Sequence, residues 1–155
     1  MAVTRKEFLL QLAVGSATLG ASSAIASFLA SCSLPTQPQG SSLPTSNGTV
    51  SGNTITVDIS SGSPLAQNGF AIVQYTGGSL LIARTNDGVY HAMTSICTHQ
   101  ACSIDQYNSA TKEFVCPCHG SRFNATGGVT NGPASSPLKQ YTTAVSGTQL
   151  IITVA

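Results

Sequence analysis

Two short segments of the chain hold sulfur and imidazole side chains at a spacing that suits a metal site. Residues 97–102 read CTHQAC and residues 116–121 read CPCHGS. Together they contain four of the five cysteines and two of the three histidines. A Cys-x-His pattern, followed after sixteen residues by Cys-x-x-His, offers two thiolates and two imidazoles from two loops.

Two kinds of cofactor accept that donor set. Tetrahedral zinc binds two cysteines and two histidines, and so does a 2Fe-2S cluster in which one iron carries histidines in place of cysteines. Each segment also carries a further cysteine, Cys102 in the first and Cys118 in the second. A zinc site has no need of these two additional cysteines. They could also be buried free thiols.

The two segments resemble the ligand loops of Rieske iron–sulfur proteins, in particular those of cytochrome bc complexes. The resemblance implies four ligands and one disulfide. The ligands would be Cys97 and Cys116 on the buried iron and His99 and His119 on the outer iron of a 2Fe-2S cluster, and the disulfide would join Cys102 to Cys118.

Other positions around the motif carry implied roles. Ser121, next to Gly120 of the second segment, matches the family serine that hydrogen-bonds a bridging sulfide, although it could also cap a turn. Pro133 lies in a Gly-Pro-Ala sequence that resembles the proline loop covering the cluster. Phe123 replaces a family tyrosine, and Gln100 replaces an apolar residue of quinol-oxidising members. These two departures argue against quinol oxidation.

The composition excludes one class of partner. Only 7% of the residues are charged, and the formal net charge is +1. From Cys32 onward the charged residues balance: Arg84, Lys112, Arg122 and Lys139 against Asp58, Asp87, Asp105 and Glu113. Because nucleic-acid binding needs a basic surface, we expect no nucleic-acid partner.

The N-terminus predicts export and membrane attachment. Residues 1–31 read as a signal peptide of the twin-arginine type, with Lys6 where the second arginine normally stands. They end in Leu-Ala-Ser before Cys32, a pattern similar to the lipidation site of bacterial lipoproteins. An uncleaved signal anchor is the alternative. Either form places the rest of the chain on the extracytoplasmic face of the membrane, where a disulfide persists.

The remaining chain divides into a linker and a β domain. Residues 32–53 are rich in Ser, Thr, Pro and Gly and predict a flexible linker. Residues 54–155 predict an all-β domain, a small antiparallel sandwich or barrel. The resemblance to Rieske proteins implies a rubredoxin-like cluster-binding subdomain at 97–123 within it. The expected strands are 55–59, 70–75, 79–84, 89–94, 103–107, 112–116, 138–145 and 149–154.

These features predict a protein that transfers single electrons. Replacing two thiolate ligands by neutral imidazoles makes a cluster easier to reduce, with a potential of roughly −150 to +300 mV. The first hypothesis is a membrane-tethered carrier, or small subunit of a respiratory oxidoreductase, that exchanges electrons with a cytochrome. The alternative is the Rieske subunit of a quinol-oxidising complex with cytochrome b, and a structural zinc lipoprotein is a remote third. No catalytic constellation indicates a self-sufficient enzyme.

Overall fold

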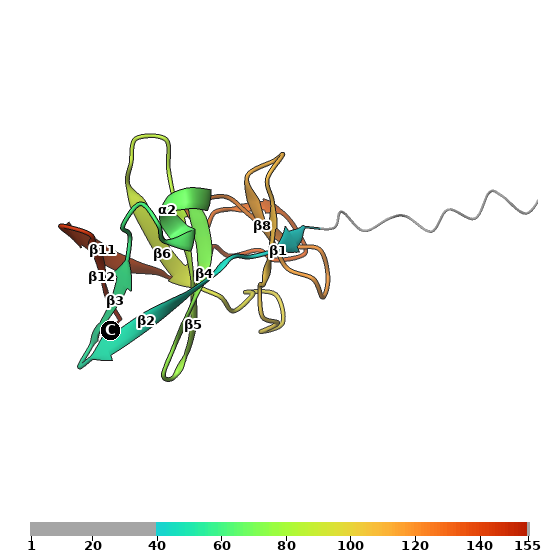
Figure 1. Ribbon diagram of the computed structural model, residues 1–155. Coiled ribbons are helices and arrows are strands. Elements are labelled where there is room, and N and C mark those ends of the chain that lie inside the picture. The colour runs from blue at the N-terminus through green and yellow to red at the C-terminus, as the bar shows by residue number, and fades with distance from the viewer. Residues whose placement is uncertain (1–39, 155) are drawn as a thin grey trace, which may run out of the picture. The chain divides into compact units, whose positions relative to one another are not determined.

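The computed structural model of the protein describes residues 40–154 (Figure 1). The predicted signal peptide, Cys32 and the first part of the predicted linker lie outside these residues. Within them, no helix is long and apolar enough to cross a membrane.

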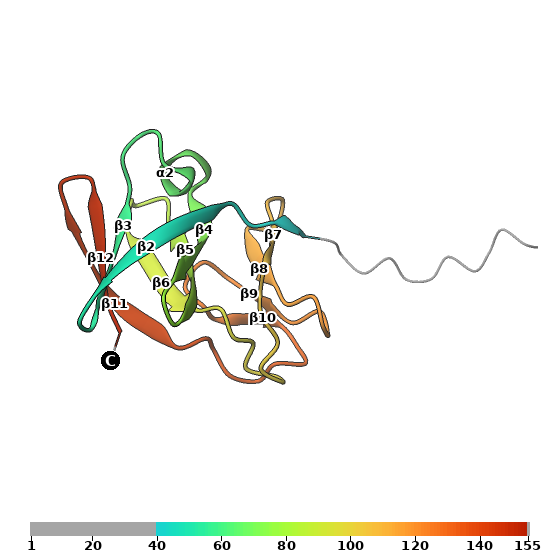
Figure 2. The same ribbon diagram turned by 60° about the horizontal axis from the view of Figure 1, so that its bottom comes forward.

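The described chain forms two β-sheets. A closed barrel has the strand order β11-β12-β3-β2-β4-β5-β6, and a five-stranded sheet has the order β1-β7-β8-β9-β10 (Figures 1 and 2). The bounds are β1 Ser41–Ser42, β2 Thr45–Ser51, β3 Thr54–Asp58, α2 Pro64–Asn68, β4 Phe70–Tyr75, β5 Gly78–Arg84, β6 Tyr90–Thr94, β7 Gln106–Asn108, β8 Glu113–Val115, β9 Arg122–Phe123, β10 Val129–Asn131, β11 Gln140–Ser146 and β12 Gln149–Thr153. The predicted all-β fold is confirmed.

Strand pairing departs from the prediction at one place. The barrel pairs are antiparallel except for β2 and β4, which run parallel, with Thr45 opposite Ile72. The predicted hairpins are present: β5 pairs with β6, β7 with β8 and β11 with β12. A parallel pair needs a long crossover connection, and β3 with α2 supplies it here. The barrel is therefore mixed.

Strands β4 and β5 are buried on both faces. On β5, Leu80 and Ile82 belong to the core inside the barrel, whereas Leu81 and Ala83 belong to a second core shared with the five-stranded sheet. A strand with two buried faces has no polar face to show, which explains the continuous apolar sequence of residues 80–83. Strands β4 and β5 thus pack the barrel against the five-stranded sheet. In that sheet, β7 and β8 lie between the two cysteine segments in sequence, and β9 and β10 follow the second segment.

The predicted linker is wrong for its second half. Residues 41–51 contain β1 and β2, so the folded domain begins near residue 40 and not at 54. Inside the barrel, a Cβ atom on Gly48 would lie 2.6 Å from Ile55 Cγ2 and 3.0 Å from Val73 Cγ1. Small and polar residues form a strand here because a close-packed neighbour requires them, and tertiary pairing overrides their low strand propensity.

One short helix also escaped prediction. The Ser63 hydroxyl accepts a hydrogen bond from the Ala66 N–H at 3.2 Å at the start of α2, and Gly69 ends the helix with a φ of 76°. A single turn of five residues is too short to show a helical hydrophobic period, although its capping residues are typical.

The close approach at Gly48 gives a test of the corrected boundary. Gly48→Ala places a methyl group against the Ile55 side chain, and we expect a loss of about 1–3 kcal/mol in the free energy of unfolding. Gly62→Ala is the matched control, because its added Cβ meets nothing within 4 Å. Chemical denaturation of both variants measures the difference. Equal stability of the two variants would mean that β2 is not packed in the barrel.

Candidate metal centre

The two cysteine segments are loops with the same backbone design. In the first, the Ala101 N–H donates to the Cys97 carbonyl at 2.9 Å, and in the second the Gly120 N–H donates to the Cys116 carbonyl at 3.0 Å. The donors both have left-handed backbones, with φ of 53° at Ala101 and 73° at Gly120. Each loop closes again one residue later, through Cys97 N–H to Cys102 O and Cys116 N–H to Ser121 O. Both loops thus fold their first cysteine inward.

The inward cysteines are free thiols inside the protein. Cys97 is 2% exposed and Cys116 is 1% exposed, and both belong to the core between the barrel and the five-stranded sheet. Burial raises the pKa of the Cys116 thiol, and the adjacent Cys97 thiol raises it further, whereas backbone N–H groups of Cys118 and His119 lower it. Since the thiolate is the form that binds metal, a cation at Cys116 would have to displace the thiol proton.

The two imidazoles lie together above the loops. The ring centres of His99 and His119 are 4.8 Å apart and the rings are nearly perpendicular, at 89°. His119 is exposed to solvent and His99 is half-buried. The Nδ1 atom of His99 is buried and has no hydrogen-bond partner. A buried polar atom without a partner is costly, so this nitrogen is positioned for a ligand that protein groups do not supply.

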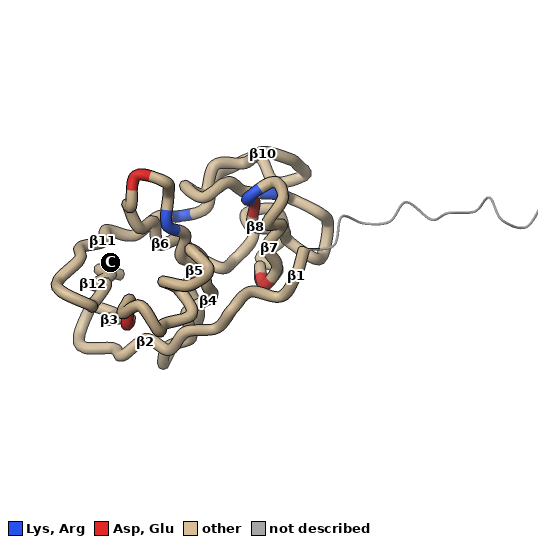
Figure 3. The backbone as a smooth tube through the Cα atoms, turned by 45° about the horizontal axis from the view of Figure 1, so that its top comes forward, with Lys and Arg blue, Asp and Glu red and all other residues tan. Residues whose placement is uncertain are grey.

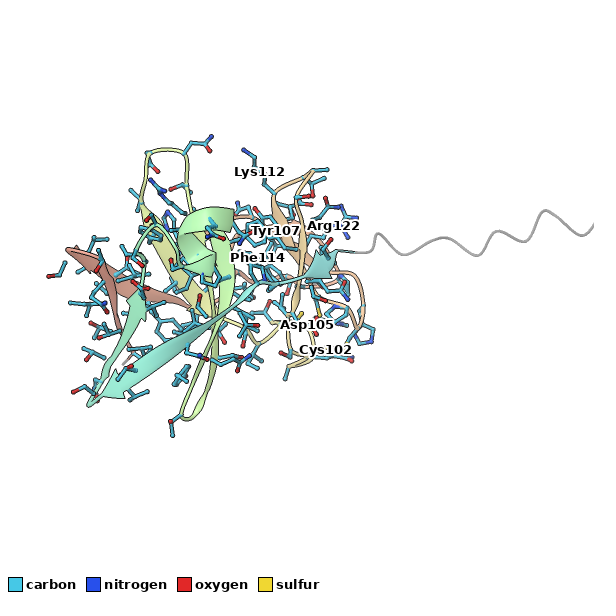
Figure 4. The ribbon with its side chains drawn as sticks, in the orientation of Figure 1. Cys102, Asp105, Tyr107, Lys112, Phe114 and Arg122 are labelled. Atoms are coloured by element: carbon cyan, nitrogen blue, oxygen red, sulfur yellow. A yellow bond between two sulfur atoms is a disulfide. The ribbon has the colours of Figure 1, made fainter. Side chains whose placement is uncertain are left out.

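The remaining cysteines bond to each other. Cys102 and Cys118 form the predicted disulfide, with Cα atoms 6.4 Å apart (Figure 4). Their sulfurs and that of Cys116 all lie within 4.8 Å of one another, but the two bonded sulfurs have no thiolate to offer a metal. The disulfide therefore holds the loops together, and of the three sulfurs only that of Cys116 is free to bind a metal.

A third loop locks the other two. Ser121 is fully buried, and its Oγ accepts a hydrogen bond from the Ala134 N–H at 3.0 Å, which leaves its own hydroxyl proton for another acceptor. The Thr98 hydroxyl donates to the Ser136 carbonyl at 2.6 Å, and Asn131 Nδ2 donates to the Gly120 carbonyl at 3.2 Å. Sequence analysis missed the two side-chain donors, because Thr98 is the unspecified residue of the Cys-x-His pattern and Asn131 lies outside both segments.

The other predicted positions lie around this arrangement. Pro133 is exposed in the third loop, after a cis peptide bond from Gly132. Phe123 is fully buried in β9 in the same core as Cys97 and Cys116. Two buried thiols and two clustered imidazoles, one with an unsatisfied nitrogen, fit a 2Fe-2S cluster of mixed ligation. By donor type alone they would also fit zinc.

Comparison with known proteins decides between a 2Fe-2S cluster and zinc. A profile of the Rieske [2Fe-2S] domain matches residues 56–142, more than half of the chain. The chain belongs to the Rieske family. Its cofactor is a 2Fe-2S cluster, and the zinc interpretation is set aside.

Named relatives of the chain include iron-sulfur subunits of the cytochrome b6-f complex. The chain is 35% identical over 138 residues to the cytochrome b6-f complex iron-sulfur subunit of Synechococcus sp. (strain CC9605), a match that covers 84% of this chain and 73% of that one. It is 32% identical over 84 residues to the subunit of the same name from Chlorobaculum thiosulfatiphilum, covering 54% and 45%. This match, like several others, spans less than half of the relative's length.

A solved Rieske structure has the same fold. The cyanobacterial plasma membrane Rieske protein PetC3 from Synechocystis PCC 6803 superposes with a TM-score of 0.55 at 33% identity, covering 63% of this chain and 99% of that one. The oxygenase–ferredoxin complex of carbazole 1,9a-dioxygenase matches with a TM-score of 0.52 at 23% identity, which shows the fold alone.

The left-handed residue in the first ligand loop predicts a stabilising substitution. An L-residue with a left-handed backbone is strained by about 1–2 kcal/mol, whereas glycine is not, although glycine loses more entropy on folding. Ala101→Gly should therefore raise the free energy of unfolding by up to about 1 kcal/mol. The control Ala110→Gly, at a residue without positive φ, should lower it. A thermal unfolding series with both variants measures the difference, and equal effects would contradict the strain at Ala101.

The disulfide predicts a second effect on stability. Replacing both Cys102 and Cys118 by Ser removes a cross-link between residues 16 positions apart, and should lower the free energy of unfolding by about 3 kcal/mol. The iron-to-protein ratio should also fall during storage, because the ligand loops then separate more easily. Thiol labelling of the native, unreduced protein provides the control. Labelling of Cys102 and Cys118 before reduction would contradict the pairing.

Proposed function

We propose that this chain is a membrane-tethered, extracytoplasmic Rieske protein that carries single electrons to or from a cytochrome. Four residues would hold the cluster: Cys97 and Cys116 on the inner iron, and His99 and His119 on the outer one. When bound, the cluster supplies a reversible one-electron couple. The buried thiols keep water from the inner half of the site, and the histidines bring the outer half to the surface.

One observation carries this proposal: two deeply buried thiols and an exposed imidazole occur in the same site. Cys97 and Cys116 are both at most 2% exposed, while His119 on the same loop as Cys116 reaches solvent. Electrons tunnel to a partner only over short distances, so a cofactor that must meet a second protein needs one exposed edge. The imidazole edge would be the point of contact.

The three loops around that edge contain no charged residue, and Asp105, Arg122 and Lys139 directly follow them in sequence. Residues 95–104, 116–121 and 131–138 form the three loops, and none of these ranges contains Asp, Glu, Lys or Arg. The charged positions of the described chain are few and lie on other segments (Figure 3). Docking at this tip would therefore rely on shape and neutral hydrogen bonds, with little long-range electrostatic attraction.

Two residues support a carrier over a quinol-oxidising subunit. Gln100 is exposed beside His99 and presents an amide where an apolar residue would favour a quinone pocket. Phe123 cannot donate a hydrogen bond to a ligand sulfur, which removes one influence that raises the potential. The second candidate, a Rieske subunit of a quinol-oxidising complex, is favoured by the relatives named as cytochrome b6-f subunits.

The membrane tether is proposed from the N-terminal sequence. Cys32 would be lipidated after removal of residues 1–31, and the chain between it and residue 40 would link the lipid to the domain. An N-terminal cysteine with several acyl chains binds membranes far more firmly than one chain does. The plasma membrane location stated for the PetC3 protein agrees with this position.

The ligand assignment is tested by single substitutions at the four positions. We expect His99→Ala, His119→Ala, Cys97→Ala and Cys116→Ala to lose essentially all iron and acid-labile sulfide, because one iron then lacks a protein ligand. His91→Ala in β6 is the matched control and should keep both in equal amounts. Metal analysis and electron paramagnetic resonance of the reduced proteins provide the measurement. Cluster retained at full occupancy in any of the four variants would remove that residue from the ligand set.

The choice between the two functions is tested in the native host. Membranes from cells that lack the protein should keep their quinol–cytochrome c reductase activity, and the purified protein, once reduced, should be reoxidised by a c-type cytochrome. Loss of the reductase activity, restored by the intact protein but not by His119→Ala, would instead establish the quinol-oxidising alternative.

A further inference from the structure

The structure contains a basic depression away from the ligand loops. A cavity of about 360 Å³ lies where the barrel meets the turn between β7 and β8. Its lining contains two cations, Arg84 and Lys112, and no acidic side chain. The other residues that line it are Asn68, Gly69, Phe70, Asn86, Tyr107 and Ser109. Half of the four basic residues after Cys32 thus gather on one small concave surface.

Neither cation has a carboxylate partner among residues 40–154. The one ion pair there joins Arg122 to Glu113 at 3.4 Å. Asp87, which is near in sequence to Arg84, accepts hydrogen bonds from the Thr85 hydroxyl and the Val89 N–H. Glu113 is thus paired with Arg122, and neither Asp87 nor Glu113 forms an ion pair with Arg84 or Lys112 within residues 40–154.

The backbone and the aromatic side chains shape this surface. Lys112 has a left-handed backbone, with a φ of 58°, which is unusual for a residue other than glycine and fixes the direction in which its side chain leaves the turn. In Figure 4 that side chain extends from the turn toward the barrel. Arg84 is held with its guanidinium 5.7 Å from the Tyr90 ring centre. Arg84 of β5 and Lys112 of the β7–β8 turn line the depression from different sheets.

The lining also offers apolar surface and neutral donors. The Phe70 and Tyr107 rings stack with centres 3.7 Å apart, and both line the depression. Burial raises the pKa of Tyr107, so its phenol keeps its proton in neutral solution. The amides of Asn68 and Asn86 and the Ser109 hydroxyl add uncharged hydrogen-bonding groups. A ligand here would meet charge at one end and aromatic carbon at the other.

We propose that this depression binds a small organic carboxylate, with its anionic group on Arg84 and Lys112 and its apolar body against Phe70 and Tyr107. A guanidinium binds a carboxylate through two parallel hydrogen bonds, and an ammonium adds a point charge. The volume is within the range of small-molecule sites. Because the ligand contacts both the barrel and the β7–β8 turn, its binding would join the two sheets.

The test is isothermal titration calorimetry of the full-length holoprotein with benzoate at low ionic strength. We expect saturable one-to-one binding that weakens as salt is raised, with no binding of benzylamine and weaker binding of inorganic phosphate. Arg84→Gln and Lys112→Asn should each weaken benzoate binding by about 10-fold or more. Asparagine is chosen at 112 because it accepts a left-handed backbone.

Matched variants separate this site from general charge effects. Lys139→Gln lowers the net charge equally but lies outside the depression, and should leave benzoate binding unchanged. Lys112→Arg keeps the cation and should retain binding within a few fold. Absence of saturable benzoate binding, or equal weakening by all three charge-removing variants, would overturn the site. Phosphate binding as tightly as benzoate would overturn the assignment to an organic ligand. Since binding is measured without electron transfer, none of these results depends on the proposed function.

Discussion

The removal of two thiols from water is the constraint on which this structure depends. Cys97 and Cys116 come from opposite ends of the β7–β8 hairpin, yet both are buried in one core. Placing them there requires two loops that turn inward, and each loop achieves this with the same pair of backbone hydrogen bonds. Burial raises the pKa of the Cys116 thiol, so a cation bound there would have to displace its proton.

Three separate ties keep the loops in place while the imidazoles remain at the surface. The disulfide joins the loops directly, and the third loop is hydrogen-bonded to both through Thr98 and Asn131. Ser121 ties the third loop to the buried end of the site through Ala134. None of these contacts provides a metal ligand. Their physical role is to restrict the side chains of the two cysteine segments to one arrangement.

The barrel supports the ligand loops because two of its strands bury their outer face as well as their inner face. Strands β4 and β5 direct alternate side chains into the barrel and toward the five-stranded sheet, so a single pair of strands serves two cores. The ligand loops thereby rest on a rigid sheet. The basic depression lined by Arg84 and Lys112 lies at the same junction.

The sequence by itself determined the chemistry and the fold class. The spacing of cysteines and histidines in residues 97–121 defines the donor set, and apolar strands separated by turns such as 86–88 define an all-β domain. These signals are local, because a ligand motif and a hairpin each lie within a few neighbouring residues.

Only the tertiary structure decided the strand at 45–51 and the parallel pairing of β2 with β4. Gly48 reads as linker in isolation, but it is required by the side chains of Ile55 and Val73, which the sequence separates from it. Likewise, nothing local links Thr98 to Ser136 or Arg84 to Lys112. These contacts depend on how distant strands pack, and a pattern of neighbouring residues carries no information about that packing.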